Sequence, residues 1–491
     1  MKSVFLKAAS LLLALLMILP LFACSNGEDG SDTAAPTGEA NTEAGTEAFF
    51  PAIKENNYDE EFVAIACSDT FRNGYFFIEQ ENIQVGNDLD EKIYERSEKV
   101  EQYLGVDVIY VDGGNYLEYG PKIKAVVQSN DNSYQMVMTH VYMEVATFIS
   151  GNMLLDFNEL ESLNLDQPYW NQTMMTELAV NDKMYCGYND FCLSLCYLIG
   201  FNKGIVEKYQ PTMGNLYEYV RNKEWTLDKM IELASLVSED SNGDGKFDKD
   251  DTYGFSGLAW VPMISFMTAS DIKLVDRDEN DELYIAAMED NADKMTTLTE
   301  KLFDFYKADC TSMWPHNDTG DHIIQLDSNR VLFQMLANYD LIHYKEESVK
   351  VGALPYPLYD SKQESYKTLN WNGQLCVPCT NDGAGPWVSD TMEMIAFFTE
   401  PVRYSFYETL LGAKVADAPD DVEMLDIIWK SQVSDLGLVF SSTSGNMDQL
   451  LYSIPACITA GNANVAAKFK SNTKVAAKSL TKMFENAARQ K

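Results

Sequence analysis

The amino-acid sequence predicts an α/β fold organised around a parallel sheet. From residue 61 onward, short apolar runs of strand length alternate with amphipathic helical patterns. This order is typical of parallel strands joined by right-handed helical crossovers. The chain has 491 residues, which is enough to bury two sizeable cores. No segment of the sequence repeats at a fixed period.

The first expected sheet has three strands with a helix in each connection. Ile93, Val100 and Leu104 recur among many charged residues, which predicts an amphipathic helix over residues 89–104. A second helix is expected to begin within residues 123–128. The strands are expected at residues 62–67, 106–111 and 134–138. Ligands of such sheets gather at the carboxyl ends of strands, which here are residues 67–69, 112–114 and 139–140.

A second αβ region is expected after residue 195. Thr226 is a plausible N-cap because its hydroxyl can accept a hydrogen bond from the first helical turn. The helix that follows carries Leu227, Met230, Ile231 and Ala234 on one face. A further amphipathic helix is expected over residues 292–307. Strands are expected at residues 195–201, 253–255 and 351–357.

An acidic loop from Asp240 to Asp251 separates the Thr226 helix from the strand at Tyr253. Oxygen side chains occupy loop positions 1, 3, 5, 9 and 12, and Gly245 at position 6 permits a sharp bend. The loop therefore predicts a structural calcium site. Its expected ligands are the side chains of Asp240, Asn242, Asp244, Asp248 and Asp251 and the backbone carbonyl of Lys246.

Two features separate this loop from an EF-hand. Asp251 stands where an EF-hand has glutamate, and its shorter arm weakens bidentate contact with the ion. An EF-hand also needs a second helix after the loop, whereas a strand is expected here. The alternative interpretation is a solvated acidic turn that holds no metal.

The N-terminal residues predict export. Lys2 and Lys7 precede an almost wholly apolar run over residues 8–22, which is too short for a membrane-spanning helix. The run ends in Leu21-Phe22-Ala23-Cys24, which looks like a bacterial lipobox. We expect residues 1–24 to be a lipoprotein signal peptide and Cys24 to carry the lipid. Ordinary secretion with an incidental cysteine is the alternative.

The segment that follows the signal is expected to be a disordered tether over residues 25–56. It is rich in Gly, Glu, Thr, Ala and Ser and has no apolar periodicity. Together with the lipidated cysteine, it places the folded part at the extracellular face of the cell membrane. The anchor is the expected contact with the membrane.

The charge of the chain excludes some partners. There are 75 acidic and 37 basic residues, which gives a formal net charge of −38. Nucleic acid and anionic lipid surfaces repel such a protein. The acidity does not identify a ligand.

Nine cysteines occur in the chain, and Cys24 belongs to the expected lipobox. Cys376 and Cys379 have the spacing of a redox or zinc motif. They lie in an apolar, strand-like run, however, with no second CxxC and no flanking histidine. We therefore expect these two thiols to pack as small buried groups, with a redox or zinc role as the alternative.

Several segments, in the same order along the chain, resemble extracellular solute-binding proteins of ABC importers, of the family 1 type found in clostridial lipoproteins. Each match is short, but together with the lipobox they cover nearly the whole chain. The matching segments are Asn181–Tyr185, Gly200–Lys203, Glu224–Asp228, Asp240–Phe255, Leu354–Pro357 and Glu423–Asp426.

The resemblance implies a two-lobed periplasmic-binding-protein-like fold of type II, with hinged lobes around a central cleft. Lobe 1 would hold residues 57–169 and 372–424, and lobe 2 would hold residues 170–371 and 425–491 with the acidic loop. Closure of such lobes couples ligand binding to docking on a permease. A monomer is the family expectation.

The implied function is capture without catalysis. A lipid-anchored solute-binding protein would take a sugar or oligosaccharide between its lobes and deliver it to the subunits of an ABC permease. The sequence contains no HExxH, GxSxG, Walker or GxGxxG motif. Two alternatives stay open: a cell-surface lipoprotein enzyme that acts on glycans, and a ligand sensor or adhesin of the same fold.

Aromatic residues make up 12% of the chain, and aromatic rings stack on the apolar faces of sugars while polar side chains bind the hydroxyl edges. Candidates for ligand binding are those near expected strand ends and lobe crossings. They are Asp69, Trp170, Tyr188, Asp190, Trp260, Tyr339, Trp371 and Asn372.

Overall fold

The computed structural model describes residues 49–66, 80–114, 116–139, 142, 144–189, 196–315, 325–344, 349–371, 373–412 and 418–489. The chain divides into two units, residues 1–49 and 50–491, and all helices and strands below belong to the second. The expected signal peptide, Cys24 and most of the expected tether lie outside the described residues and stay predictions.

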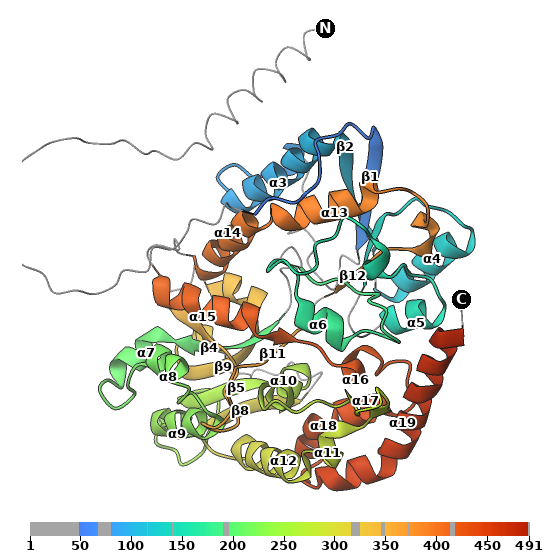
Figure 1. The fold of residues 1–491 in the computed structure, drawn as a ribbon. Coiled ribbons are helices and arrows are strands. Elements are labelled where there is room, and N and C mark those ends of the chain that lie inside the picture. Colours follow the sequence, from blue (N-terminus) through green and yellow to red (C-terminus); the bar gives the residue numbers. More distant parts are fainter. Residues whose placement is uncertain are drawn as a thin grey trace, which may run out of the picture. The chain divides into compact units, whose positions relative to one another are not determined.

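The first sheet has the strand order β12-β3-β1-β2 (Figure 1). Its core is parallel, because β1 pairs in parallel with both β2 and β3, while β12 adds an antiparallel edge on β3. The predicted parallel arrangement of the first three strands is therefore confirmed. The strands are β1 (Glu60–Ala66), β2 (Val106–Asp112), β3 (Met136–Thr139) and β12 (Gln374–Cys376).

Four helices accompany this sheet. Helix α3 buries Ile93, Val100 and Leu104, as the sequence predicts, and α13 and α14 pack against it. The predicted start of the next helix is wrong, since α4 begins at Tyr116 and residues 123–128 are its last part. Pro121 lies inside α4, and an interior proline disguises a helix in the sequence. The helices are α3 (Asp88–Leu104), α4 (Tyr116–Gln128), α13 (Trp387–Phe397) and α14 (Glu400–Leu411).

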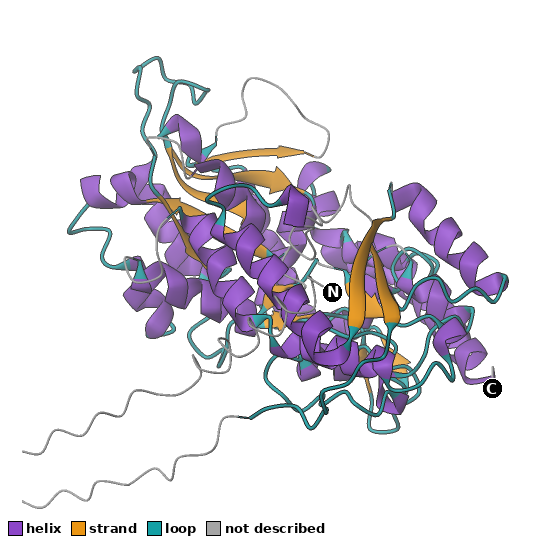
Figure 2. Cartoon of the chain, turned by 90° about the horizontal axis from the view of Figure 1, so that it is seen from above, coloured by secondary structure: helices purple, strands orange, loops and turns teal. Residues whose placement is uncertain are grey.

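The second sheet has the order β10-β4-β9-β5-β8 and is mixed. Strand β5 pairs in parallel with β8 and β9, whereas β4 runs antiparallel to β9 and β10. Figure 2 shows the strands of the protein flanked by helices. The strands are β4 (Tyr197–Asn202), β5 (Tyr253–Ala259), β8 (Thr311–Pro315), β9 (Val331–Ala337) and β10 (Val351–Leu354).

Helix α9 (Leu227–Val237) shows how local sequence positions the second sheet. Thr226 caps it as predicted, and its side chain accepts a hydrogen bond from the backbone N–H of Lys229. The apolar face packs on β5 and β9. Trp225 is fully buried before the cap, and its indole Nε1 donates to the carbonyl of Pro355 at 2.8 Å.

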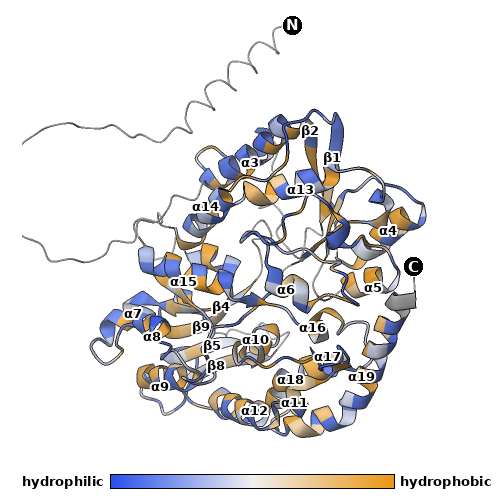
Figure 3. Cartoon of the chain, viewed as in Figure 1, coloured by the Kyte–Doolittle hydropathy of each residue, from blue (hydrophilic) through white to orange (hydrophobic). Residues whose placement is uncertain are grey.

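Helices α10 (Val261–Ala269) and α12 (Ala292–Tyr306) also pack on the second sheet. Buried hydrophobic side chains from both sheets belong to one continuous cluster. Figure 3 shows hydrophobic strands in the second sheet and hydrophilic patches on α3 and on the C-terminal helix α19 (Val465–Arg489). The fold is therefore a mixed α/β arrangement of two sheets, as the sequence predicts.

The remaining elements are short or lie beside the sheets. The helices are α5 (Val145–Ser150), α6 (Gln172–Glu177), α7 (Lys203–Lys208), α8 (Leu216–Arg221), α11 (Ala286–Glu289), α15 (Pro419–Lys430), α16 (Leu436–Val439), α17 (Met447–Leu451) and α18 (Ser453–Thr459). Two small ribbons pair β6 (Asp276–Arg277) with β7 (Leu283–Tyr284) and β11 (Thr368–Leu369) with β13 (Gln432–Val433). No helix of the described residues has both the length and the apolar character needed to cross a membrane.

Two chain segments connect the sheets and pair with each other. The segment that leads from β3 to β4 forms a backbone bridge between Gly187 and Leu375, and another between Cys196 and Asn370. Asn370 lies on the segment that returns from β10 to the first sheet, whereas Leu375 lies in β12 itself. The two connections therefore run side by side at Cys196 and Asn370, and the first of them also pairs with the edge strand β12 at Gly187. The exact lobe boundaries proposed from the sequence stay predictions.

Candidate functional site

The carboxyl ends of the parallel strands in the second sheet gather aromatic side chains. Trp260 follows directly after β5, Tyr339 follows β9 by two residues, and Trp314 lies near the end of β8. Tyr197 begins the antiparallel β4 and is paired with Ala337, so it lies at the same edge. Four segments far apart in the sequence thus place rings at one edge of one sheet.

These rings line a pocket of about 650 Å³, which we call the strand-end pocket. Its size is in the range of small-molecule sites, which combine aromatic walls with a few polar groups. Its lining residues are Tyr197, Leu258, Trp260, Val261, Pro262, Trp314, Gln325, Asp327, Gln334, Met335, Leu336, Ala337, Tyr339, Asp340, His343 and Tyr344.

Backbone hydrogen bonds fix the side chains of two polar residues that line the pocket. Asp340 accepts a hydrogen bond from the N–H of Ala337 at 3.0 Å, and Gln334 accepts one from the N–H of Leu326 at 2.9 Å. Burial raises the pKa of Tyr197 and of Tyr344. Both phenols therefore keep their protons at neutral pH and can donate hydrogen bonds.

A row of four aromatic side chains leads from this pocket to the first sheet. Trp260 stacks on Tyr452 with ring centroids 4.4 Å apart and an angle of 19° between the rings. Tyr452 meets Tyr142 edge to face at 6.3 Å, and Tyr142 stacks on Trp371 at 6.0 Å. We call Trp260, Tyr452, Tyr142 and Trp371 the aromatic row.

The aromatic row joins the carboxyl edges of both sheets. Tyr142 lies three residues after β3, at the carboxyl edge of the first sheet, and Trp371 lies on the segment that leads into β12. Burial raises the pKa of Tyr142, with Asp448 as a further cause, and burial also raises that of Tyr452. Flat apolar surface and hydroxyl donors therefore occur together along the row.

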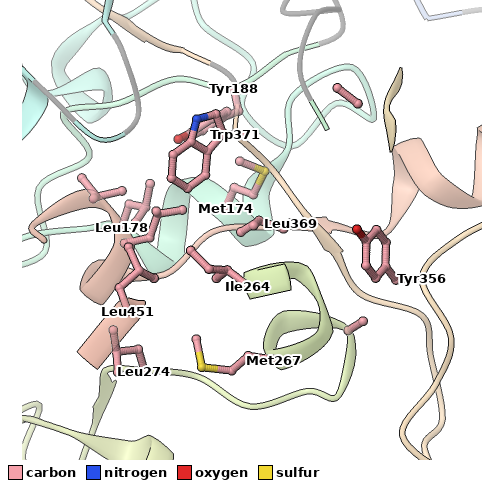
Figure 4. Close-up of a cluster of buried hydrophobic side chains, with 14 of the residues drawn as sticks. Met174, Leu178, Tyr188, Ile264, Met267, Leu274, Tyr356, Leu369, Trp371 and Leu451 are labelled. Atoms are coloured by element: carbon pink, nitrogen blue, oxygen red, sulfur yellow. The ribbon is translucent and has the colours of Figure 1, made fainter. Parts of the chain in front are cut away.

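Only some of the ligand-binding candidates proposed from the sequence lie at the strand-end pocket or in the aromatic row. Trp260 and Tyr339 line the strand-end pocket, and Trp371 belongs to the aromatic row. Trp371 is also largely buried, and Figure 4 draws it with Tyr188 among the buried hydrophobic side chains near Met174 and Leu369. Asp69, Asp190 and Asn372 lie outside the described residues.

Trp170 and Tyr188 are core residues in this structure, with exposed fractions of 3% and 2%. The indole Nε1 of Trp170 donates to the carboxylate of Glu393 at 2.9 Å, and its ring meets Phe157 edge to face. These contacts explain why a large aromatic residue occurs at position 170 without a ligand.

Sequence reasoning missed several residues of the site, namely Tyr142, Tyr197, Trp314, Tyr344 and Tyr452. Tyr142 could have been found, because it follows the third expected strand end by three residues. Strand β8, which carries Trp314, was not predicted. Tyr452 lies between α17 and α18, where no local pattern marks it as part of a site.

The acidic loop is closed by an antiparallel bridge between Glu239 and Thr252. The predicted order of helix, loop and strand is confirmed, because α9 precedes the loop and β5 follows it. Gly245 has a φ angle of 79°, so it adopts the left-handed conformation that the sharp bend at position 6 requires.

The carboxylates of the loop accept hydrogen bonds from the loop's own backbone. Asp240 accepts from the N–H groups of Gly243 and Gly245, at 2.7 and 2.8 Å. Asp251 is fully buried, and its two oxygens accept from the N–H groups of Asp248 and Ser241 at 2.8 Å each. These bonds lower the pKa of Asp251, the one from Asp248 most strongly.

The acidic loop has some of the properties that a cation site requires. Aspartate oxygens at alternate positions suit a hard cation, and a carboxylate oxygen that accepts one N–H keeps further lone pairs. Within the described residues, however, no group of three or more His, Cys, Asp or Glu side chains is arranged to hold a metal ion. The calcium site therefore stays a prediction.

No protein-family model matches this sequence, and no curated protein matches it at a significant level. Solved structures do match its fold. UgpB from Mycobacterium tuberculosis, in complex with glycerophosphocholine, superposes with a TM-score of 0.56 at 13% identity, over 86% of this chain and 99% of that chain.

Two further matches are carbohydrate complexes. A cyclo/maltodextrin-binding protein with maltotetraose has a TM-score of 0.52 at 12% identity, over 88% of this chain and 97% of that chain. The ABC substrate-binding protein Lmo0181 from Listeria monocytogenes, in complex with cycloalternan, has a TM-score of 0.50 at 12% identity. The match covers 88% of this chain and 98% of that chain. The chain therefore has the two-lobed α/β fold of periplasmic-binding-protein-like solute-binding proteins, which confirms the predicted fold class.

Proposed function

We propose that this protein binds a carbohydrate at the strand-end pocket and along the aromatic row, without catalysis. The observation that carries the proposal is the meeting of aromatic side chains from both sheets at their carboxyl edges. Trp260 belongs both to the pocket lining and to the row. It is therefore the residue to which we assign the largest share of the binding free energy.

The chemistry of the pocket fits a sugar better than a wholly apolar ligand. A pyranose ring has apolar C–H faces that stack on indole and phenol rings, and hydroxyl edges that need polar partners. Asp327, Asp340 and His343 line the pocket beside Trp260 and Trp314. Carboxylates accept hydrogen bonds from hydroxyl groups, and the protonated tyrosines donate them.

The wider biological role rests on the sequence and on the fold. We propose that the protein is a monomer, anchored at the extracellular face of the cell membrane through lipid on Cys24, and that it delivers its ligand to an ABC permease. The lipobox-like segment and the match to the fold of ABC substrate-binding proteins support this role. An adhesin or ligand sensor of the same fold is the alternative.

A ligand screen with a test for turnover separates these functions. We expect one or more oligosaccharides, with maltotetraose and cycloalternan in the panel, to raise the melting temperature of the mature protein, because a ligand that binds only the folded state stabilises it. We expect the bound sugar to be recovered intact. Release of shorter sugars would favour a glycan-active enzyme, for which Asp327 and Asp340 would be the carboxylates in the pocket.

We also propose that the acidic loop binds calcium as a structural ion. The loop concentrates five carboxylates between Asp240 and Asp251, and their mutual repulsion is relieved by a divalent cation. We expect millimolar calcium to raise the melting temperature of the mature protein and to release or absorb heat in calorimetry.

The matched variants for this experiment are Asp240→Asn and Asp250→Asn. Asp240 is an expected ligand, whereas Asp250 is exposed and is not one. Calcium should stabilise the wild type and Asp250→Asn but should have little effect on Asp240→Asn. Absence of both heat and thermal stabilisation in the wild type at millimolar calcium would rule the site out.

A further inference from the structure

Two buried cysteines face each other where the segment that leads from β3 to β4 pairs with the edge strand β12. Gly187 and Leu375 exchange two backbone hydrogen bonds, with N–H to oxygen distances of 2.7 and 3.0 Å. They form an isolated antiparallel bridge. One step along this bridge, Cys186 on one segment stands opposite Cys376 on the other.

The register makes this a favourable position for a disulfide. Because Gly187 and Leu375 are a hydrogen-bonded pair, the next opposed pair is a non-hydrogen-bonded one, in which Cα atoms lie about 4.5 Å apart and side chains approach closely. Disulfides span Cα separations of about 4.4 to 6.8 Å. Cys186 and Cys376 can therefore be joined without moving the backbone far.

The two thiols lie close enough to influence each other. Cys376 is the main cause that raises the pKa of the Cys186 thiol, and both residues are buried. The other described cysteines have different surroundings. The thiol of Cys310 lies beside the hydroxyl groups of Ser235 and Thr311. Burial raises the pKa of the Cys457 thiol, and the charge of Lys468 opposes this shift.

We propose that Cys186 and Cys376 form a reversible disulfide that fastens the segment leading from β3 to β4 to β12, the edge strand of the first sheet. The oxidant is a small disulfide such as oxidised glutathione. One thiolate attacks it and releases one small thiol. The second cysteine then resolves the mixed disulfide, so that one S–S bond forms in the protein, one breaks in the oxidant, and two small thiols leave.

The cross-link would restrict movement of one sheet relative to the other. Residues 187 to 375 include the whole second sheet, so the bond would close this part of the chain into a covalent loop. Such a bond restricts the unfolded chain and stabilises the fold. It would also tie the connection between β3 and β4 to the edge of the first sheet, which would restrict how far this connection can move when one sheet turns relative to the other.

The neighbouring thiol and burial set the conditions for the reaction. The contact with Cys376, followed by burial, raises the pKa of Cys186. The thiolate is the attacking species, so the cross-link should form slowly at neutral pH and faster as the pH rises. An oxidising extracellular setting, which the proposed function provides, would favour it.

The test uses the mature chain incubated with oxidised glutathione at about pH 8.5. Non-reducing digestion and mass spectrometry should show the peptides of Cys186 and Cys376 joined, with the mass of the pair lower by two hydrogens. The melting temperature should rise by about 3 °C or more and should return to its starting value with dithiothreitol.

Three variants make the result specific. Cys186→Ala and Cys376→Ala should lose both the cross-link and the thermal shift, and Cys457→Ala should keep both. The proposal is overturned if oxidised wild type carries Cys186 and Cys376 as free thiols, as separate glutathione adducts, or joined to other cysteines. The mass readout needs no ligand, so this outcome would leave the proposed carbohydrate binding untouched.

Discussion

Gly254→Ala is expected to destabilise the protein by more than about 4 kcal/mol, which is at the extreme of single substitutions. A Cβ atom at this position would lie 1.9 Å from the carbonyl oxygen of Ala234, and 2.3 and 2.5 Å from its carbonyl carbon and Cα. All three are backbone atoms of α9. The helix would have to move away from β5, and the buried faces of both elements would lose contact.

The measurement is urea unfolding of the mature chain, followed by circular dichroism. The matched control is Gly445→Ala, because a Cβ atom there would meet Val475 at an ordinary 3.5 Å. We expect the control to change the free energy of unfolding by less than about 1 kcal/mol. Equal stability of Gly254→Ala and the wild type would show that α9 does not pack on β5 as closely as described.

Glu393→Ala is expected to cost about 3 to 5 kcal/mol, because each buried donor that loses its acceptor costs about 1 to 3 kcal/mol and the removed side chain leaves a cavity. Glu393 lies on α13 and is fully buried. Its carboxylate accepts from the hydroxyl of Tyr169 at 2.5 Å, the indole of Trp170 at 2.9 Å and the backbone N–H of Asn164 at 3.1 Å. Alanine would leave the buried indole of Trp170 and two partly buried donors without an acceptor, and it would open a cavity.

Two further variants test the cause of this loss. Glu393→Gln keeps the shape and one acceptor oxygen, so its unfolding free energy should lie between those of Glu393→Ala and the wild type. Glu400→Ala removes an exposed carboxylate whose ion pair with Arg403 spans 3.6 Å, and such surface pairs are worth about 1 kcal/mol or less. A loss for Glu393→Ala no larger than for Glu400→Ala would contradict the network.

Local patterns in the sequence predicted the elements that carry a single strong period. The apolar repeat of α3 and the cap at Thr226 are properties of a few neighbouring residues, so they could be read without tertiary structure. Helix α4 could not be delimited in this way, since Pro121 interrupts its pattern. The run at β12 is strand-like in the sequence, but its antiparallel pairing with β3, more than 200 residues earlier, is a long-range contact that no local pattern reveals.

The motif segments that resemble solute-binding proteins have a structural explanation. Trp225 donates to the carbonyl of Pro355, and Gly254 lets β5 approach α9. Three of the segments therefore meet in the core of the second sheet rather than at the pocket. For this reason they predicted the fold but carried no information on which residues line the strand-end pocket.

Aromatic content alone could not separate the pocket from the core. Trp170 and Trp260 both lie near expected strand ends or crossings, yet the first is held by buried Glu393 and the second lines the strand-end pocket. Trp260 lies at the pocket because of the order of the neighbouring strands in the second sheet. That order, β4-β9-β5-β8, is set by long-range pairing.

The central claim is that Trp260 and its neighbours bind a carbohydrate. Its most direct test is calorimetric titration of wild type, Trp260→Ala and Trp429→Ala with maltotetraose, cycloalternan and glycerophosphocholine. Trp429 lies on α15, outside the pocket lining, so it controls for loss of an indole. We expect a carbohydrate to bind the wild type and Trp429→Ala alike, and Trp260→Ala to bind it at least about tenfold more weakly, a loss of about 1.4 kcal/mol. Equal affinity of Trp260→Ala and the wild type, or binding of none of the carbohydrates, would contradict the claim.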